Sequence, residues 1–205
     1  MSRVPVAVLI SGSGTNLQAL IDASRAPDFP AELAVVVSNR ERAFGLDRAR
    51  AAGIPTEVVP GRAFPMREDY DRALVDVLRR FSVQWVALAG FMRLVTPVLL
   101  EAFPWRVLNI HPALLPAFPG LHAQEQALAA GVTTSGATVH FVDAGMDTGP
   151  IIAQRAVPVL EEDTLETLKA RNLSVEHQLY PMVLKWAAEG RIFIDGRKVS
   201  IAPTP

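Results

Sequence analysis

The sequence predicts an α/β fold: a Rossmann-like, doubly wound, mostly parallel sheet with helices on both faces, then antiparallel strands and a long helix. Apolar runs of about five residues alternate with segments of helical period. The early runs are continuously apolar, which is typical of parallel strands covered on both faces. Towards the C-terminus apolar and polar residues alternate instead, which indicates antiparallel strands.

In the first half, the predicted helix at 67–81 has the clearest pattern, because Leu74, Val77, Leu78 and Phe81 lie on one face. A glycine at position 53 ends another helix, since glycine readily adopts the left-handed conformation found at helix ends. The predicted strands are 6–10, 32–39, 55–58, 85–90 and 106–111, and the predicted helices are 16–23, 43–53, 67–81 and a short one after Thr96-Pro97.

In the second half, the segments 137–144 and 151–159 are close in sequence and predict paired antiparallel strands. A long helix is predicted from Asp163, the expected N-cap, with Glu166 three residues on as its capping-box partner. It runs to Gly190. With 205 residues and no internal repeat or linker, we expect a single domain spanning 1–205.

The composition argues against several classes of partner. Twenty basic and 21 acidic residues leave a formal net charge of −1 without a basic run, so neither nucleic acid nor a membrane surface is expected. The absence of cysteine excludes disulfides and Cys-based zinc sites. The apolar run near the N-terminus is too short to span a membrane and lacks the layout of a signal peptide, so we expect a cytoplasmic protein.

The turn GSGTNL at 12–17 resembles a phosphate-binding loop. A dinucleotide fingerprint needs a third glycine where Leu17 stands, and no carboxylate follows the second strand at 38–40. No Gly-Lys pair follows Gly12 at the spacing of a nucleoside triphosphate loop. Two interpretations stay open: a single phosphate bound by the amides of 14–16, or a turn whose glycines serve only close helix–strand contact.

A second group of polar residues follows the predicted strand at 106–111. Asn109 and His111 lie two residues apart, so their side chains point to the same side at the strand end where ligands bind in parallel sheets. Asp143 and Asp147 flank a Gly-containing turn, and either aspartate can orient a histidine and raise its pKa. Each residue also has a purely structural interpretation, as a strand-end histidine or a turn-capping residue.

A catalytic metal is not expected. The histidines at 111, 122, 140 and 177 show no close ligand spacing, and His140, in the middle of a predicted strand, is interpreted as structural.

Four motifs then identify a family resemblance. ISGSGTNLQALI, LAGFMRLV, LNIHPALLPAFPGLHA and GATVHFVDAGMDTGPII occur in the order and spacing of the phosphoribosylglycinamide formyltransferase family. The resemblance extends from Val6 to about Arg191. It implies a phosphate-binding half at about 1–105 and a catalytic, folate-binding half at about 106–205.

The resemblance also implies roles for individual residues. The residues that match the catalytic set are Asn109, His111 and Asp147. Those that match the substrate-binding set are Gly14, Thr15, Asn16 and Glu176, and those that match the folate-binding set are Arg67, Met92, Arg93, Leu94, Val95, Asn109, Asp143, Ala144, Gly145, Met146 and Asp147.

The implied reaction moves the formyl group of 10-formyltetrahydrofolate, a co-substrate, to the amine of N1-(5-phosphoribosyl)glycinamide in de novo purine biosynthesis. No metal, nucleotide cofactor or covalent intermediate is implied, and the expected state is a monomer or homodimer. We expect Asn109 to stabilise the oxyanion, His111 to act as an imidazolium acid, and Asp147 to keep His111 protonated.

The chain departs from the family pattern at Ser13, Thr15 and Ala113. Ser13 and Thr15 keep small side chains and backbone donors, whereas Ala113 lacks the usual serine hydroxyl, which leaves the contacts of its loop open.

Other functions are weighed against this one. A formyltetrahydrofolate hydrolase uses the same catalytic residues with water, but its family carries an extra N-terminal domain. Methionyl-tRNA formyltransferase is disfavoured because it adds a C-terminal RNA-binding domain. A non-catalytic folate or sugar-phosphate binding module is a third possibility that fold alone does not exclude. An NAD-dependent oxidoreductase is disfavoured by Leu17 and the missing acidic residue.

Overall fold

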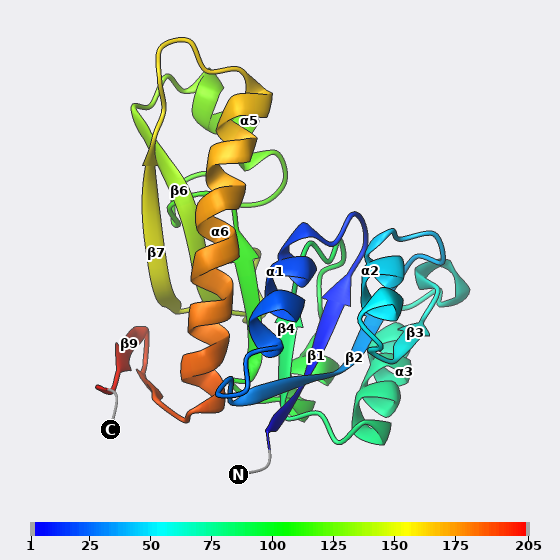
Figure 1. Ribbon diagram of the computed structural model, residues 1–205. Coiled ribbons are helices and arrows are strands. Elements are labelled where there is room, and N and C mark those ends of the chain that lie inside the picture. Colours follow the sequence, from blue (N-terminus) through cyan, green and yellow to red (C-terminus); the bar gives the residue numbers. More distant parts are fainter. Residues whose placement is uncertain (1–2, 204–205) are drawn as a thin grey trace. The chain divides into compact units, whose positions relative to one another are not determined.

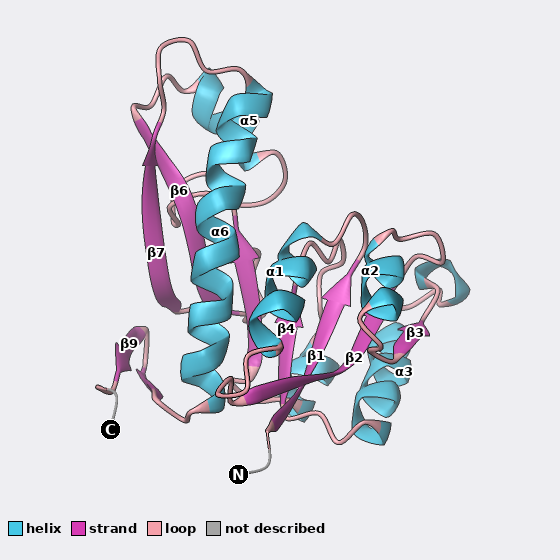
Figure 2. Cartoon of the chain, in the orientation of Figure 1, coloured by secondary structure: helices cyan, strands magenta, loops and turns pink. Residues whose placement is uncertain are grey.

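The computed structural model describes residues 3–203 (Figures 1 and 2). Within them, a first compact unit ends at Asn109 and a second begins at Ile110. Hydrogen-bonded strands follow the order β3-β2-β1-β4-β5-β6-β7, with a separate β8-β9 pair, so the fold is the predicted α/β fold with a mostly parallel sheet.

The first unit contains parallel strands whose apolar side chains are almost completely buried. Residues 6–10 of β1 and 35–37 of β2 are inaccessible to solvent, as expected for strands covered on both faces. The strands are β1 (Val4–Ile10), β2 (Ala31–Ser38), β3 (Thr56–Val58), β4 (Trp85–Leu88) and β5 (Val107–His111), and neighbouring strands among them pair in parallel.

The helices of this unit follow from the order of its strands. From β1 the chain moves to β2 and β3 on one side, then returns to β4 and β5 on the other. Right-handed crossovers therefore place the early and late helices on opposite faces, and α1 contacts α2 while α3 contacts α4. The helices are α1 (Thr15–Ser24), α2 (Gly45–Ala51), α3 (Arg67–Arg80) and α4 (Pro97–Ala102), with a 3₁₀ turn at Gly61–Ala63.

The order in which the chain adds strands to the sheet reverses between β1 and β4, which are parallel. The loops that follow these two strands are hydrogen-bonded to each other. Ser11 N donates to Gly90 O at 3.2 Å. In an open α/β sheet, such a switch point is where ligands bind. The sheet therefore positions the loop after β1 at a place suited to a ligand.

In the second unit, β6 and β7 form a long antiparallel pair, and α6 lies along both strands (Figure 1). Its elements are α5 (Ala123–Ala129), β6 (Thr134–Phe141), β7 (Ile151–Pro158), α6 (Leu165–Ala188), β8 (Ile192–Asp195) and β9 (Lys198–Ile201). Figure 2 shows the same elements by type. None of the helices within residues 3–203 is long and apolar enough to cross a membrane.

The structure corrects several predicted boundaries. The long helix begins at Leu165 rather than Asp163: Thr164 is its N-cap, and the capping box pairs Thr164 with Thr167 instead of Asp163 with Glu166. Asp163 is instead held by Arg171 and by the amide of Leu160. The helix predicted at 43–53 is shorter, spanning Gly45–Ala51. The 3₁₀ turn, α5, β8 and β9 are not among the predicted elements, since their segments lack a clear apolar pattern.

We expect Gly136→Ala to destabilise the β6–β7 pair. A Cβ at Gly136 would lie 2.2 Å from the backbone oxygen of Arg155 and 2.7 Å from the side chain of Leu114, so the strands would have to separate. Overpacking of this kind costs about 1–3 kcal/mol of the free energy of unfolding, measurable by denaturant titration.

The adjacent Ser135→Ala is the matched control. Ser135 is buried, and its hydroxyl makes no hydrogen bond within residues 3–203, so removing it should change the free energy of unfolding little. Equal stability of the Gly136→Ala variant and the wild-type chain would show that β6 and β7 can separate without cost.

Candidate active site

The loop after β1 turns into α1 through Gly14, a position where any side chain would be strained. Gly14 precedes α1 with a φ of 71°, a left-handed conformation that glycine adopts without strain. A Cβ at this position would lie 2.7 Å from the Cα of Gly45 in α2. The backbone N–H groups and the positive end of the helix dipole point outward at the start of a helix, so the start of α1 favours an anion.

An arginine that the sequence analysis did not single out holds this loop. Arg48 in α2 donates from Nε to Ser13 O at 2.9 Å and from Nη1 to Gln18 Oε1 at 3.3 Å. Its guanidinium also lies 5.1 Å from the ring centre of Phe44. The loop predicted to bind phosphate therefore has a fixed positive charge beside it.

A single hydroxyl joins the loops that follow β1, β2 and β4. Ser11, which is 2% exposed, donates to Asn39 Oδ1 at 2.6 Å and accepts from Met92 N at 2.8 Å. Asn39 lies in the stretch 38–40, where a dinucleotide-binding protein is expected to carry a carboxylate, and here its side chain accepts the hydrogen bond from Ser11. The predicted phosphate loop and the start of the predicted folate-binding segment 92–95 are therefore coupled.

The remaining predicted residues of the first unit are placed as follows. Arg67 is the first residue of α3 and is exposed. Met92 and Leu94 are 57% and 48% exposed, respectively. Asn109 lies on β5, opposite Leu88 of β4 and two residues before His111.

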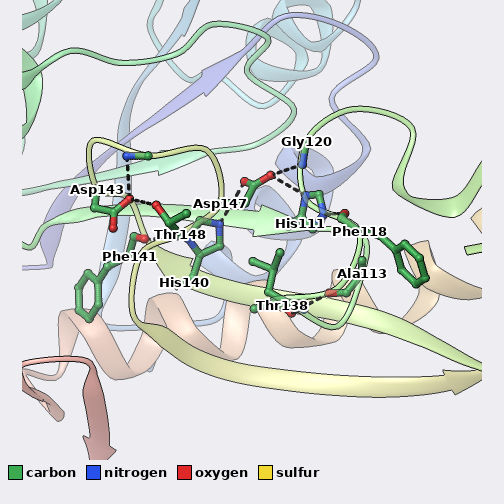
Figure 3. Close-up of polar contacts among 12 residues, drawn as sticks. His111, Ala113, Phe118, Gly120, Thr138, His140, Phe141, Asp143, Asp147 and Thr148 are labelled. Carbon is green, nitrogen blue, oxygen red and sulfur yellow. Dashed lines mark hydrogen bonds and ion pairs between the residues drawn. The ribbon is translucent and has the colours of Figure 1, made fainter. Parts of the chain in front are cut away.

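In the second unit, the carboxylate of Asp147 lies between two buried imidazoles (Figure 3). Oδ2 is 3.4 Å from His111 Nδ1, and Oδ1 is 3.5 Å from His140 Nε2. Oδ2 also accepts a shorter hydrogen bond, 2.8 Å, from Gly120 N. His140, interpreted from sequence as structural, is therefore a direct neighbour of the predicted catalytic aspartate.

Both imidazoles face two hydrogen-bond acceptors. The other ring nitrogen of His111, Nε2, lies 2.8 Å from Phe118 O, and His140 Nδ1 lies 2.7 Å from Phe141 O. A carbonyl oxygen only accepts, so these ring nitrogens carry hydrogens. A neutral imidazole has one N–H, and only the protonated form can donate both to its carbonyl and to Asp147.

Burial works against that protonated form. Burial lowers the pKa of His111 below the usual 6.5, and neither Asp147 nor the contact with Phe118 O, which both raise it, fully compensates. This direction is opposite to the one expected if Asp147 keeps His111 protonated, because desolvation of the imidazolium outweighs the nearby carboxylate. As the pH falls, His111 is protonated at a higher pH in the unfolded chain than in the folded chain. The folded state therefore loses stability as the pH falls below about 6.5.

Asp147 itself is held in the ionised form. Burial raises its pKa, but hydrogen bonds from His140 and from Gly120 N, together with the two histidines' charges, lower it below the usual 3.8 overall. The carboxylate therefore carries a negative charge between two imidazoles that are 5% and 2% exposed as side chains.

The turn that carries Asp147 depends on two glycines. A Cβ on Gly149 would lie 1.7 Å from Phe141 O, and one on Gly145 would lie 2.0 Å from the Thr148 hydroxyl. Thr148 donates that hydroxyl to Asp143 at 2.7 Å, and Asp143 also accepts from Gly145 N. Asp143 thus shapes the turn, while Asp147 faces the histidines (Figure 3). Ala144 and Met146 are exposed on the same turn.

The loop after β5 is held by hydrogen bonds to Thr138 of β6. The Thr138 hydroxyl donates to Ala113 O at 2.7 Å and accepts from Leu115 N at 3.1 Å and from Gln154 Nε2 at 2.9 Å. Ala113 is fully buried, so its methyl group fills the place where the family pattern has a hydroxyl. The backbone of this loop is held without that hydroxyl.

Helix α6 carries two buried polar residues, Asn172 and Glu176. Asn172 donates from Nδ2 to Pro112 O at 2.9 Å and to Gly136 O at 3.1 Å, which ties the residue after His111 to the helix. Glu176, predicted to contact substrate, is one turn further along α6 and is 4% exposed. Among residues 3–203, no group of three or more histidine or carboxylate side chains is arranged to hold a metal ion.

Comparisons with known proteins by sequence and by structure all match formyltransferases. A family model described as "Formyl transferase" matches residues 4–184. The phosphoribosylglycinamide formyltransferase of Haemophilus influenzae is 43% identical over 199 residues, which cover 94% of this chain and 94% of that protein. The crystal structure of glycinamide ribonucleotide transformylase 1 from Symbiobacterium toebii is similar with a TM-score of 0.96 and 54% identity, over 98% of this chain and 95% of that chain.

Longer relatives match only in part. The human "Trifunctional purine biosynthetic protein adenosine-3" is 48% identical over 190 residues, which cover 93% of this chain. This chain spans only 14% to 19% of the length of that protein and its counterparts from Drosophila pseudoobscura and cattle.

We expect Asp147→Asn to lower the pKa of His111 further, because the attraction that favours the imidazolium is lost. The measurement is a titration of the histidine resonances by NMR. Asp143→Asn is the matched control: it neutralises a carboxylate in the same turn that bonds Gly145 and Thr148 instead of a histidine. An unchanged or higher pKa of His111 in the Asp147→Asn variant would contradict the geometry described above.

Proposed function

Because the chain belongs to the formyl transferase family, we propose that it transfers the formyl group of 10-formyltetrahydrofolate to the amine of N1-(5-phosphoribosyl)glycinamide. The products are the N-formyl compound and tetrahydrofolate, in de novo purine biosynthesis. The observation that carries this proposal is the ionised Asp147 beside His111, with Asn109 two residues earlier on β5. These are the residue types that acyl transfer to an amine requires.

The substrate phosphate is bound by the loop at 14–16. Gly14 allows the backbone to turn sharply, the amides at the start of α1 supply donors, and Arg48 adds a positive charge beside Ser13. A single phosphate fits this loop better than a dinucleotide, because Leu17 stands where the dinucleotide fingerprint has glycine. Buried Glu176 supplies a carboxylate for the polar part of the same substrate.

The formyl-folate is bound by segments that expose large apolar side chains. Met92 and Leu94 on the segment after β4, and Met146 on the turn before Asp147, are each about half exposed or more. Flat aromatic rings, such as the pterin, gain from contact with flexible thioether and aliphatic side chains. Arg67 and Asp143 supply charged or polar groups for the rest of the co-substrate.

In the chemical step, the neutral amine attacks the formyl carbon, and the carbonyl electrons move to oxygen. Asn109 donates a hydrogen bond to that developing oxyanion. The attacking nitrogen must then lose a proton, and the folate nitrogen must gain one as its bond to carbon breaks. Atoms and charges therefore balance when one proton moves from the attacking nitrogen to the leaving nitrogen.

His111 performs this proton transfer through Nε2, because Nδ1 faces Asp147. The contact of Nε2 with Phe118 O has to be exchanged for a contact with substrate. Once that contact is exchanged, the single hydrogen of neutral His111 lies on Nδ1 and is donated to Asp147. Nε2 then has a free electron pair, which takes the proton from the attacking nitrogen and returns it to the leaving nitrogen. The lowered pKa of His111 suits this role, since the imidazole starts neutral near pH 7.

The proposal is tested by following folate absorbance in the presence and absence of glycinamide ribonucleotide. We expect tetrahydrofolate to form only when the ribonucleotide is present, in equal amount to the formylated product. Tetrahydrofolate formation without it would identify a hydrolase, and binding of formyl-folate without any turnover would identify a binding module.

We expect Asn109→Ala to lower kcat roughly 100- to 1000-fold, the usual effect of removing one oxyanion donor. Asp147→Asn should lower kcat by roughly 100- to 10,000-fold, because His111 loses its orientation and its proton partner. Glu161→Gln, which neutralises an exposed carboxylate, is the control and should turn over normally. Normal turnover of the Asp147→Asn variant would refute the assigned mechanism.

A further inference from the structure

The segment 92–95 is irregular in structure, yet it holds two large apolar side chains in solvent. Met92 and Leu94 are 57% and 48% exposed, and neither belongs to a helix or strand. A segment without regular backbone hydrogen bonds needs other contacts to keep one conformation. The structure provides such contacts at its start, its middle and its end.

The start and the middle are held by neutral groups. Met92 N donates to the buried hydroxyl of Ser11, as described above. The Arg93 guanidinium lies 4.0 Å from the ring centre of Tyr70 and donates to Gly61 O at 3.3 Å. The Tyr70 ring is itself fully buried, with Phe64 and Phe91 as aromatic neighbours.

The end is held by a buried carboxylate. Asp71 in α3 is 2% exposed, and its Oδ2 accepts hydrogen bonds from both Thr96 N at 2.6 Å and Thr96 Oγ1 at 2.8 Å. Thr96 is the residue before α4, and the next residue, Pro97, has no N–H to donate. Asp71 therefore fixes the backbone at the point where the segment enters α4.

Burying a carboxylate costs more desolvation free energy than burying a neutral group that could make the same structural contact. Burial raises the pKa of Asp71, while the two hydrogen bonds from Thr96 and the charge of Arg93 oppose that rise. Asp71 and Tyr70 are adjacent on α3, so consecutive residues of one helix contact Thr96, which directly follows the segment, and Arg93 within it.

We propose that Asp71 is a positioning residue that holds the segment 92–95 in the conformation that binds formyl-folate. The inference rests on the proposed function, because that function assigns the segment to the co-substrate. Asp71 does not touch substrate; it acts through Thr96 and, by charge, through Arg93.

The test compares Asp71→Ala, Asp71→Asn and Asp76→Ala in the full chain. Asp76 is an exposed carboxylate on the same helix, so Asp76→Ala is the matched control. We expect Asp71→Ala to raise the KM for 10-formyltetrahydrofolate roughly tenfold or more, the effect of losing hydrogen bonds to a charged group. The kcat and the KM for glycinamide ribonucleotide should change less than about twofold, and Asp76→Ala should match wild type.

Asp71→Asn should restore most of the affinity. Both Thr96 donors reach the same carboxylate oxygen, so the amide oxygen of asparagine can accept both while the charge is lost. Thr96→Ala, which removes only the hydroxyl donor, should give an intermediate KM and keeps the proposal testable if Asp71→Ala does not fold. A purely structural role would lower the amount of folded protein without separating the two KM values.

The outcomes distinguish the inference from the function on which it rests. Wild-type protein that neither binds nor uses formyl-folate would overturn the proposed function and the inference together. A wild-type chain that uses formyl-folate, with an unchanged KM for it in folded Asp71→Ala and Thr96→Ala, would overturn the inference alone.

Discussion

The geometry of the second unit depends on one buried carboxylate. Asp147 is anionic, only 12% of its side-chain surface is exposed, and it is stabilised by two imidazoles and the amide of Gly120. A buried charge is tolerated only when it is paired and hydrogen-bonded, so these partners have little freedom to move apart. Asp147 has a φ of 55°, a left-handed conformation that aspartate tolerates better than most residues.

The same carboxylate acts on the charge of His111. It favours a proton on His111, whereas burial and the nearby His140 disfavour one, and the balance leaves the pKa of His111 below its usual value. A proton relay works best when its pKa is close to the working pH, and a neutral imidazole can first accept and then return a proton. The lowered pKa of His111 is therefore compatible with the proposed proton transfer.

Much of this molecule follows from its sequence, for reasons that differ between elements. Buried parallel strands such as β1 and β2 are continuous apolar runs, and α3 repeats its apolar residues at helical spacing, so both are visible locally. The short helix α5 and the β8–β9 pair lack a strong pattern. The N-cap of α6 was misplaced by one residue, because Asp163 and Thr164 are both good caps and only the contact of Asp163 with Arg171 decides between them. Arg48 and Asp71 were missed because their hydrogen-bond partners, Ser13 and Thr96, are far away in sequence. His140 was interpreted as structural, because its place in the middle of a strand does not reveal that Asp147 lies beside its ring. The lowered pKa of His111 also could not be predicted, since it depends on burial.

The central claim is that Asp147 is an ionised carboxylate shared by two buried histidines. The most direct test is the ¹³Cγ chemical shift of Asp147, followed through an acid titration of the unliganded protein. As the pH is lowered to the usual pKa of 3.8, the ¹³Cγ shift should stay at the value of the ionised carboxylate, for as long as the chain stays folded. A titration step at or above that value in the folded chain would contradict the account.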